Sequence, residues 1–234
     1  ALLADARGRV LRTSIAGPLP AGADGGWLDG PNVVVRIGAD ELIVARRNDI
    51  GLRGRHNLAN VVMASAIARA AGFSGNAIAA AIRTFRGVPH RLESVGRAHG
   101  ALWINDSIAT SPERAIAGME AYHERVVLLL GGRGKNLPLE RLQDLVKQRC
   151  RAVVCFGEAG EQFADAMLGV LREVHLVPTL DDAVERAASL VQPGDVVLLS
   201  PGGTSFDAYP NFEARGQHFR ELVRRLDGFS EEVN

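Results

Sequence analysis

The chain has 234 residues, of which 47% are hydrophobic, with 27 basic and 27 acidic side chains and a formal net charge of zero. This balance gives no electrostatic reason to expect nucleic acid or an anionic membrane surface as a partner. The longest apolar runs, residues 126–130 and 196–199, are strand-sized and too short to span a membrane. The first residues show no signal peptide, and Cys150 and Cys155 form no metal-binding pattern. We therefore expect a cytoplasmic protein.

Residues 1–55 differ in composition from the rest of the chain. Glycine and proline interrupt residues 17–31, and two apolar runs, 33–37 and 41–44, then flank Gly38-Ala39-Asp40. This pattern predicts a β-hairpin. A few short strands cannot bury a core alone, so we interpret the segment as part of a sheet whose other strands are missing. The chain is then a piece of something larger.

Two predicted helices follow. Residues 57–71 are rich in alanine, carry Leu58, Val61 and Val62 on one side, and stop at Gly72. Ser74 predicts the N-cap of a second helix that reaches about residue 85. Residues 87–89, Gly-Val-Pro, break the helical pattern, and we place a domain boundary there. The two predicted domains are residues 1–89 and 90–234.

From residue 90 onward, strands and helices alternate. We expect strands near residues 92–96, 101–105, 126–130, 152–156, 174–177 and 196–199. We expect helices near residues 112–121, 138–148, 160–171, 181–192 and 211–226. The alternation predicts a Rossmann-like α/β fold, with a mostly parallel sheet covered by helices on both faces.

Two of these helices carry recognisable start signals. Thr179 and Asp182 have the spacing of a capping box, with aspartate in place of glutamate. Ser111 precedes Pro112, so we expect the serine hydroxyl to accept a bond from a free helical N–H and the proline to occupy the first helical position.

Three loops after predicted strands, residues 105–111, 131–135 and 200–207, should meet at one edge of the sheet. Ligands of open α/β sheets bind beyond the carboxyl ends of the strands. The second loop combines glycines with Lys135, and the third combines two glycines with three hydroxyl residues. Such groups suit oxyanions, so we predict a site for an anionic small molecule.

Six stretches, taken together in their order and spacing, resemble the Mur ligases of peptidoglycan synthesis. They are His56–Asn60, Phe85–Glu93, Asn105–Thr110, Leu130–Lys135, Leu199–Asp207 and Asn211–Gly216. The last two stretches resemble most closely the member of the family that adds glutamate. The resemblance covers residues 51 to 226.

The resemblance implies a three-domain parent, with a UDP-sugar domain, a central ATPase and a C-terminal amino-acid domain. This chain would hold the end of the central domain (1–89) and the whole C-terminal domain (90–234). No G-x-G-K-S/T loop occurs in the sequence, so the cradle for the ATP phosphates and most Mg²⁺ ligands would lie elsewhere in the parent. The implied substrates are ATP, UDP-N-acetylmuramoyl-L-alanine and glutamate, joined through an acyl phosphate, and the implied protein is a monomer.

The resemblance also implies roles for individual residues. The nucleotide contacts would be Asn57 and Asn60 at the adenine, and Arg91 and Asp106 at the ribose and phosphates. The glutamate contacts would be Thr110 and Lys135 at the α-carboxylate, with Ser205, Phe206 and Phe212 at the side-chain end. The resemblance assigns no catalytic residue and no metal ligand in this chain.

Two positions depart from the pattern of the glutamate-adding member. Ile108 stands where lysine is common, and Arg133 stands where aspartate is common. We hypothesise that Arg133 takes over the lost positive charge, or that the acceptor pocket differs. The second option leaves L-glutamate open as the acceptor.

Two other interpretations remain open. One is a non-catalytic module that binds a nucleotide or a carboxylate, although Arg91 and Asp106 at a domain junction have no evident use there. The other is a related ligase with a different acceptor, such as a folylpolyglutamate synthase or the ligase-like subunit of a peptidoglycan amidotransferase. The 200–216 stretch, and the lack of a cysteine cluster for a zinc ribbon, argue against it.

Overall fold

The computed structural model describes residues 7–231. The chain forms two compact units that divide between Arg86 and Gly87. This division lies three residues before the boundary expected after Pro89. Each unit has its own hydrophobic core and is described separately.

The first unit is a four-stranded sheet with two helices. Its elements are β1 (Arg12–Ser14), β2 (Gly25–Asp29), β3 (Asn32–Ile37), β4 (Asp40–Arg46), the 3-10 helix η1 (Arg47–Asp49), α1 (Arg55–Ala70) and α2 (Gly75–Thr84). The strands lie in chain order; β1 is parallel to β2, and the other neighbours are antiparallel. The predicted hairpin is β3 and β4, whereas β1 and β2 were not predicted.

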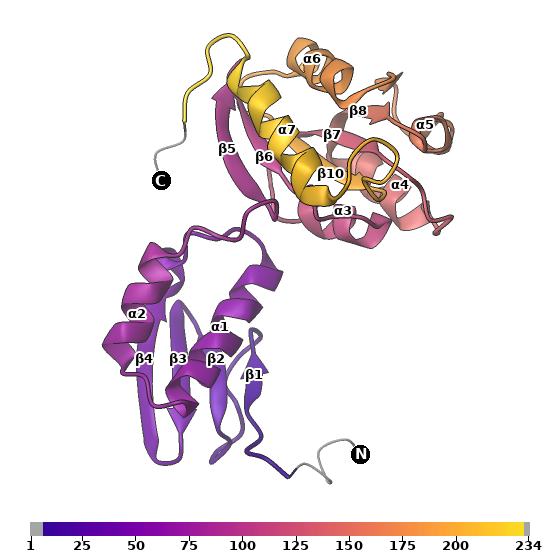
Figure 1. Ribbon diagram of the computed structural model, residues 1–234. Helices are drawn as coiled ribbons and strands as arrows, with labels where there is room; N and C mark the ends of the chain where they lie inside the picture. Colours follow the sequence, from indigo (N-terminus) through magenta and orange to yellow (C-terminus); the bar gives the residue numbers. More distant parts are fainter. Residues whose placement is uncertain (1–6, 232–234) are drawn as a thin grey trace. The chain divides into compact units, whose positions relative to one another are not determined.

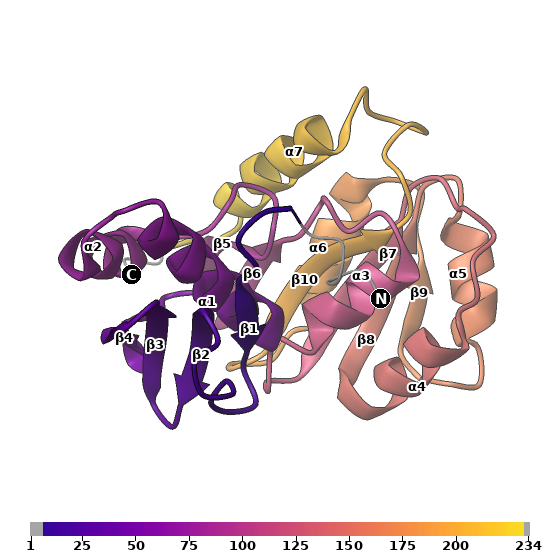
Figure 2. The same cartoon turned by 90° about the horizontal axis from the view of Figure 1, so that it is seen from below.

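The core of the first unit lies between the sheet and the helices, which cover one of its faces (Figures 1 and 2). Val33 and Val35 of β3 point to this face because strand side chains alternate, and Val62 and Ala66 of α1 meet them. All four side chains are fully buried. The core of this unit therefore consists of side chains from the strands and from α1 and α2.

The second unit holds the remaining elements. Its strands are β5 (Glu93–Ala98), β6 (Ala101–Asn105), β7 (Val126–Gly131), β8 (Cys150–Phe156), β9 (Val174–Leu176) and β10 (Val196–Gly202). Its helices are α3 (Pro112–Met119), α4 (Glu140–Arg149), α5 (Gly160–Met167), α6 (Leu180–Leu190) and α7 (Phe212–Arg224). Every strand and helix expected after residue 90 is present.

The strand order of the second sheet is β5-β6-β10-β7-β8-β9. Strand β10, the last in sequence, lies between β6 and β7 and is parallel to both. Strands β7, β8 and β9 continue in parallel, and only β5 pairs antiparallel, with β6. The prediction of a mostly parallel sheet is confirmed.

Both faces of this sheet are buried under helices, as predicted (Figure 1). Leu128 and Leu130 of β7 contribute to a core with α3, α4 and α5, whereas Val127 and Leu129 contribute to the opposite core with α6 and α7. The alternation follows from the two-residue repeat of a strand. Parallel strands buried on both faces are continuous apolar runs in sequence, as β7 is.

The helix starts are only partly as predicted. The capping box of α6 is present, because Thr179 accepts a bond from the N–H of Asp182 and the Asp182 carboxylate accepts one from the N–H of Thr179. Ser74 caps α2 through the N–H of Ala77. The prediction for Ser111 is wrong: it is the N-cap residue of α3, but its side chain makes no capping bond, and Pro112 alone fulfils its predicted role.

Within residues 7–231, no helix is both long enough and apolar enough to cross a membrane.

Candidate functional site

The three loops predicted to converge are hydrogen-bonded to one another. Strands β6, β10 and β7 are parallel neighbours, so their carboxyl ends share one edge of the sheet. The N–H of Gly202 donates to Ala109 O at 2.9 Å, which joins the first loop to the third. Arg133 and Thr204 exchange two backbone bonds of 2.8 and 2.9 Å, which join the second to the third.

Glycine is required where the second and third loops cross. Gly132 has a φ of +88°, and a Cβ there would lie 2.1 Å from Thr204 O. A Cβ at Gly203 would lie 2.5 Å from Gly131 O. These approaches are too close for any side chain, so the glycines allow the two loops to pack backbone against backbone.

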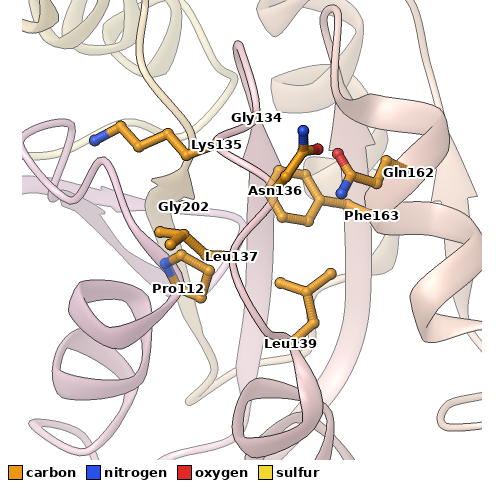
Figure 3. Close-up of a pocket in the computed structure, with 9 residues that line it drawn as sticks. All are labelled: Pro112, Gly134, Lys135, Asn136, Leu137, Leu139, Gln162, Phe163 and Gly202. Atoms are coloured by element: carbon orange, nitrogen blue, oxygen red, sulfur yellow. The ribbon is translucent and has the colours of Figure 1, made fainter.

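Lys135 and Thr110, predicted to share one carboxylate, do lie together. The Lys135 ammonium group is 3.4 Å from the Thr110 hydroxyl and is exposed. Lys135 also borders a small open recess with Pro112, Gly202 and Phe163 (Figure 3). In this view the Lys135 side chain points away from the amide groups of Asn136 and Gln162, which lie on the other side of the recess.

The three residues predicted for the other end of glutamate differ in exposure. Ser205 is 2% exposed, whereas Phe206 is 63% exposed, and both belong to the third loop. Phe212 is the first residue of α7 and is half-buried, with its ring 6.2 Å from the ring of His90 in an edge-on contact.

Arg133, the proposed substitute cation, already has a carboxylate partner. Its Nε donates to Glu158 at 2.9 Å, and both side chains are about half exposed. The backbone N–H of Glu158 donates to the Asp207 carboxylate of the third loop at 3.2 Å. The charge of Arg133 is therefore partly offset by Glu158.

The predicted nucleotide contacts divide between the two units. Asn57 and Asn60 lie on α1 of the first unit; Asn57 is buried and donates to Arg53 O at 2.8 Å, and Asn60 is exposed. Arg91 of the second unit is exposed. Asp106 is only 5% exposed, and its carboxylate accepts bonds from Leu92 N at 3.2 Å and Ser200 Oγ at 2.9 Å.

Burial makes the Asp106 carboxyl group an unusually weak acid. The loss of water around the carboxyl group raises its pKa to about 7, although the bonds from Ser200 and Leu92 N favour the ionised form. The carboxyl group thus joins the first loop to Leu92 and to Ser200 of the third loop. Perturbed carboxyl groups are often found at functional sites, and this one belongs to the first of the converging loops.

Arg215 and Ser107 form a buried hydrogen-bonded pair that no sequence pattern indicated. Arg215 of α7 is 0% exposed and donates to Gly203 O at 3.2 Å and to both the hydroxyl and the carbonyl of Ser107, at 3.0 and 2.9 Å. Its pKa is lowered to about 10 by burial, so it is still a cation at neutral pH. An arginine on a helix is usually exposed, and no periodicity distinguishes this one.

No metal site accompanies these groups in the part of the chain that the structure describes. Within residues 7–231, no three histidine, cysteine, aspartate or glutamate side chains are close enough to hold a metal ion.

Residues 90–203, which contain the first two loops and the start of the third, match the family model described as Mur ligase, glutamate ligase domain. The chain belongs to the Mur ligase family. Within that family it is similar to proteins named UDP-N-acetylmuramoylalanine--D-glutamate ligase.

Two such relatives are from Pelotomaculum thermopropionicum and Desulfitobacterium hafniense. The first is 35% identical over 226 residues, which are 96% of this chain and 49% of the relative. The second is 37% identical over 204 residues, or 87% of this chain and 45% of the relative. The chain therefore spans about half the length of the curated relatives it matches.

A solved structure supports the fold. The folylpolyglutamate synthase of Mycobacterium tuberculosis, complexed with ADP and AMPPCP, has a TM-score of 0.58 and 18% identity, and the match covers 83% of this chain and 46% of that one. At this level of identity, the likeness shows a shared fold alone.

Proposed function

We propose that this chain is the C-terminal part of an ATP-dependent ligase that joins D-glutamate to UDP-N-acetylmuramoyl-L-alanine in peptidoglycan synthesis. The observation that carries the proposal is the meeting of three loops around Lys135 and Thr110, within a region that matches the glutamate ligase domain. The names of the relatives support the substrate and the D-configuration. We place the reaction in the cytoplasm, where ATP is available.

Lys135 and Thr110 are suited to one carboxylate of glutamate. The ammonium group and the hydroxyl are 3.4 Å apart, so both can donate to the same carboxylate. Within residues 7–231, no carboxylate pairs with Lys135, which leaves its charge for a ligand. Ser205, Phe206 and Phe212 would contact the second carboxylate and the chain between the two.

The nucleotide contacts are assigned to exposed groups. We assign Asn60 and Arg91 to direct contact with ATP, because both are exposed. Asp106 acts indirectly, since its carboxylate is occupied by Leu92 N, next to Arg91, and by Ser200. When bound, ATP supplies the phosphoryl group that activates the alanine carboxylate of the UDP-linked substrate; the residues of this chain then orient glutamate and exclude water. The Mg²⁺ ligands would be supplied by other parts of the parent protein.

A titration tests this proposal. We expect D-glutamate to shift the backbone amide NMR signals of Thr110, Lys135 and Ser205 in the 234-residue chain, with weak, millimolar-range affinity. Lys135→Met should weaken binding at least fivefold, because it removes the unpaired cation. Lys147→Met is the matched control, since Lys147 lies in the last turn of α4, outside the three loops.

Two results would contradict the proposal. If D-glutamate shifted none of these amides, the assignment of the site would be wrong. If Lys147→Met weakened binding as much as Lys135→Met, the effect would be general electrostatics rather than the site. Stronger binding of L-glutamate than of D-glutamate would instead reverse the assigned stereochemistry.

Arg133 provides a second measurement. If Arg133 compensates for the absent lysine at position 108, then Arg133→Ala in the full-length ligase should raise the KM for glutamate. The ion pair with Glu158 tempers this effect, so we expect a rise of a few-fold, about 1 kcal/mol or less. An unchanged KM would reject the compensation hypothesis without affecting the role of Lys135.

A further inference from the structure

The hydroxyl group of Ser107 joins two elements of the candidate site. Ser107 lies in the first loop and is 0% exposed. Its Oγ donates to the carbonyl oxygen of Phe212 at 2.9 Å and accepts a bond from Arg215 Nε at 3.0 Å. One oxygen atom thus connects the first loop to the first turn of α7.

Ser107 is itself held firmly. Its backbone N–H donates to the side chain of Asn105 at 3.2 Å, and its carbonyl accepts a bond from Arg215 Nη2 at 2.9 Å. Because backbone and side chain are both engaged, the hydroxyl has a fixed direction toward Phe212. A buried network in which each polar group has a partner specifies one arrangement of its members.

The same network reaches the other two loops. The Arg215 guanidinium also donates to Gly203 O of the third loop at 3.2 Å. It lies so close to the second loop that a Cβ at Gly132 would be 2.7 Å from Arg215 Nη1. The Ser107 hydroxyl, which accepts from Nε, is therefore one of the three oxygen atoms that orient this guanidinium beside the loops.

We propose that Ser107 is a positioning residue for the glutamate site. Its hydroxyl sets the distance between the first loop, which carries Thr110, and the start of α7, which carries Phe212. This inference rests on the proposed function, because Thr110 and Phe212 are assigned to opposite ends of the same dicarboxylate. Ser107 does not contact the ligand, since it is fully buried.

The test compares Ser107→Ala with Ser65→Ala in the 234-residue chain. Ser65 of α1 is a matched control, because it is 2% exposed and its hydroxyl donates to the carbonyl of Val61 at 2.7 Å, in the first unit. Both variants lose a buried hydroxyl bonded to a backbone carbonyl, and both should lower the thermal midpoint of their own unit. Only Ser107→Ala should weaken D-glutamate binding, by about fivefold or more.

A second readout does not depend on glutamate. The Nε–H proton of Arg215 should exchange slowly with water in the wild-type chain, because it is buried and bonded to Ser107 Oγ. In Ser107→Ala we expect exchange at least ten times faster, together with shifts of the amide signals of Phe212 and Ala214. If Ser107→Ala does not fold, Ser107→Cys is measured in its place, since a thiol is a weak donor of nearly the same shape.

These readouts separate the two proposals. If the wild-type chain binds neither enantiomer of glutamate, the proposed function fails, and the exchange of Arg215 Nε–H still decides whether Ser107 holds α7. Wild-type exchange and wild-type affinity in Ser107→Ala would overturn the inference. An equal loss of affinity in Ser65→Ala would also overturn it, because general stability would then explain the effect.

Discussion

The carboxyl group of Asp106 illustrates how one buried side chain couples the site to pH. Burial raises its pKa from 3.8 to about 7. The folded state therefore holds the proton more tightly than the unfolded state does between these values. The contribution of the Asp106 carboxyl group to the free energy of unfolding is present at low pH and is lost as the pH rises from about 4 to about 7.

We expect Asp106→Asn to remove this pH dependence. The amide can still accept from Leu92 N through oxygen and can donate to the Ser200 hydroxyl, so both contacts survive. The free energy of unfolding of the wild type relative to the variant should fall as the pH rises through this window. Urea unfolding followed by the fluorescence of Trp103, in a Trp27→Phe background, reports on the second unit.

A constant difference between the two proteins from pH 4 to pH 7 would contradict this prediction. It would mean that the carboxyl group of Asp106 has a similar pKa in the folded and unfolded states. The bonds from Ser200 and Leu92 N would then offset the effect of burial.

At the scale of elements, the crossing of the second and third loops should tolerate an added side chain poorly. Gly132→Ala introduces a Cβ 2.1 Å from Thr204 O at a φ of +88°. Gly169→Ala is the matched control, because Gly169 has a φ of +77° and no atom within 4 Å of the added Cβ. We expect the control to lose about 1 kcal/mol from backbone strain and Gly132→Ala to lose clearly more.

Urea unfolding of both glycine variants measures the difference. Equal losses in the two proteins would show that the loops separate freely, and would weaken the case that they form one rigid site. A larger loss in Gly132→Ala should coincide with shifted amide signals at Arg133 and Thr204, which exchange hydrogen bonds across the crossing.

The two predicted helix caps should respond differently to alanine. Thr179→Ala removes a real capping bond of α6 and should cost about 1 kcal/mol of stability. Ser111→Ala removes no capping bond of α3 and should cost less than about 0.5 kcal/mol. A larger loss from Ser111→Ala, measured by urea unfolding of the second unit, would reveal a contribution of Ser111 that its contacts do not explain.

Helices and strands could be predicted from the sequence where their residue pattern had a single physical cause. Apolar runs such as residues 126–130 predicted buried parallel strands because only those are buried on both faces. The glycine-rich residues 17–31 hid β2 (Gly25–Asp29), because strands are poor in glycine. The convergence of the loops followed from the edge rule for parallel sheets, but the central place of β10 did not, since strand order depends on long-range pairing.

The sequence pointed to side chains in the three loops of the candidate site, but not to the buried hydrogen bonds that join these loops to α7. Lys135 and Thr110 were found through loop composition and the family resemblance, and they lie together. Ser107 and Arg215 were not predicted, because their role comes from burial. An arginine on an amphipathic helix is expected to face solvent. The resemblance included both residues in its motifs but assigned a task to neither.

For the whole molecule, the sequence limits what this chain can do alone. It contains no G-x-G-K-S/T phosphate loop, and it spans about half of its curated relatives. We therefore expect no ATP hydrolysis by the 234-residue chain and only weak glutamate binding, because closure against other domains would complete the pocket. A coupled phosphate-release assay tests this, with a full-length relative as the positive control; appreciable turnover by the chain would contradict it.

The placement of β10 has a consequence for how the polypeptide emerges from the ribosome. Strands β6 and β7 are joined in the sheet by β10, which lies between them and whose residues follow those of β6 by more than ninety positions. We therefore expect the two parts of the sheet, β5-β6 and β7-β8-β9, to stay unjoined until Val196–Gly202 leaves the exit tunnel. The strands of the first unit pair in chain order, so this unit has no such delay. During translation we expect the first unit to fold early and the second unit to fold late.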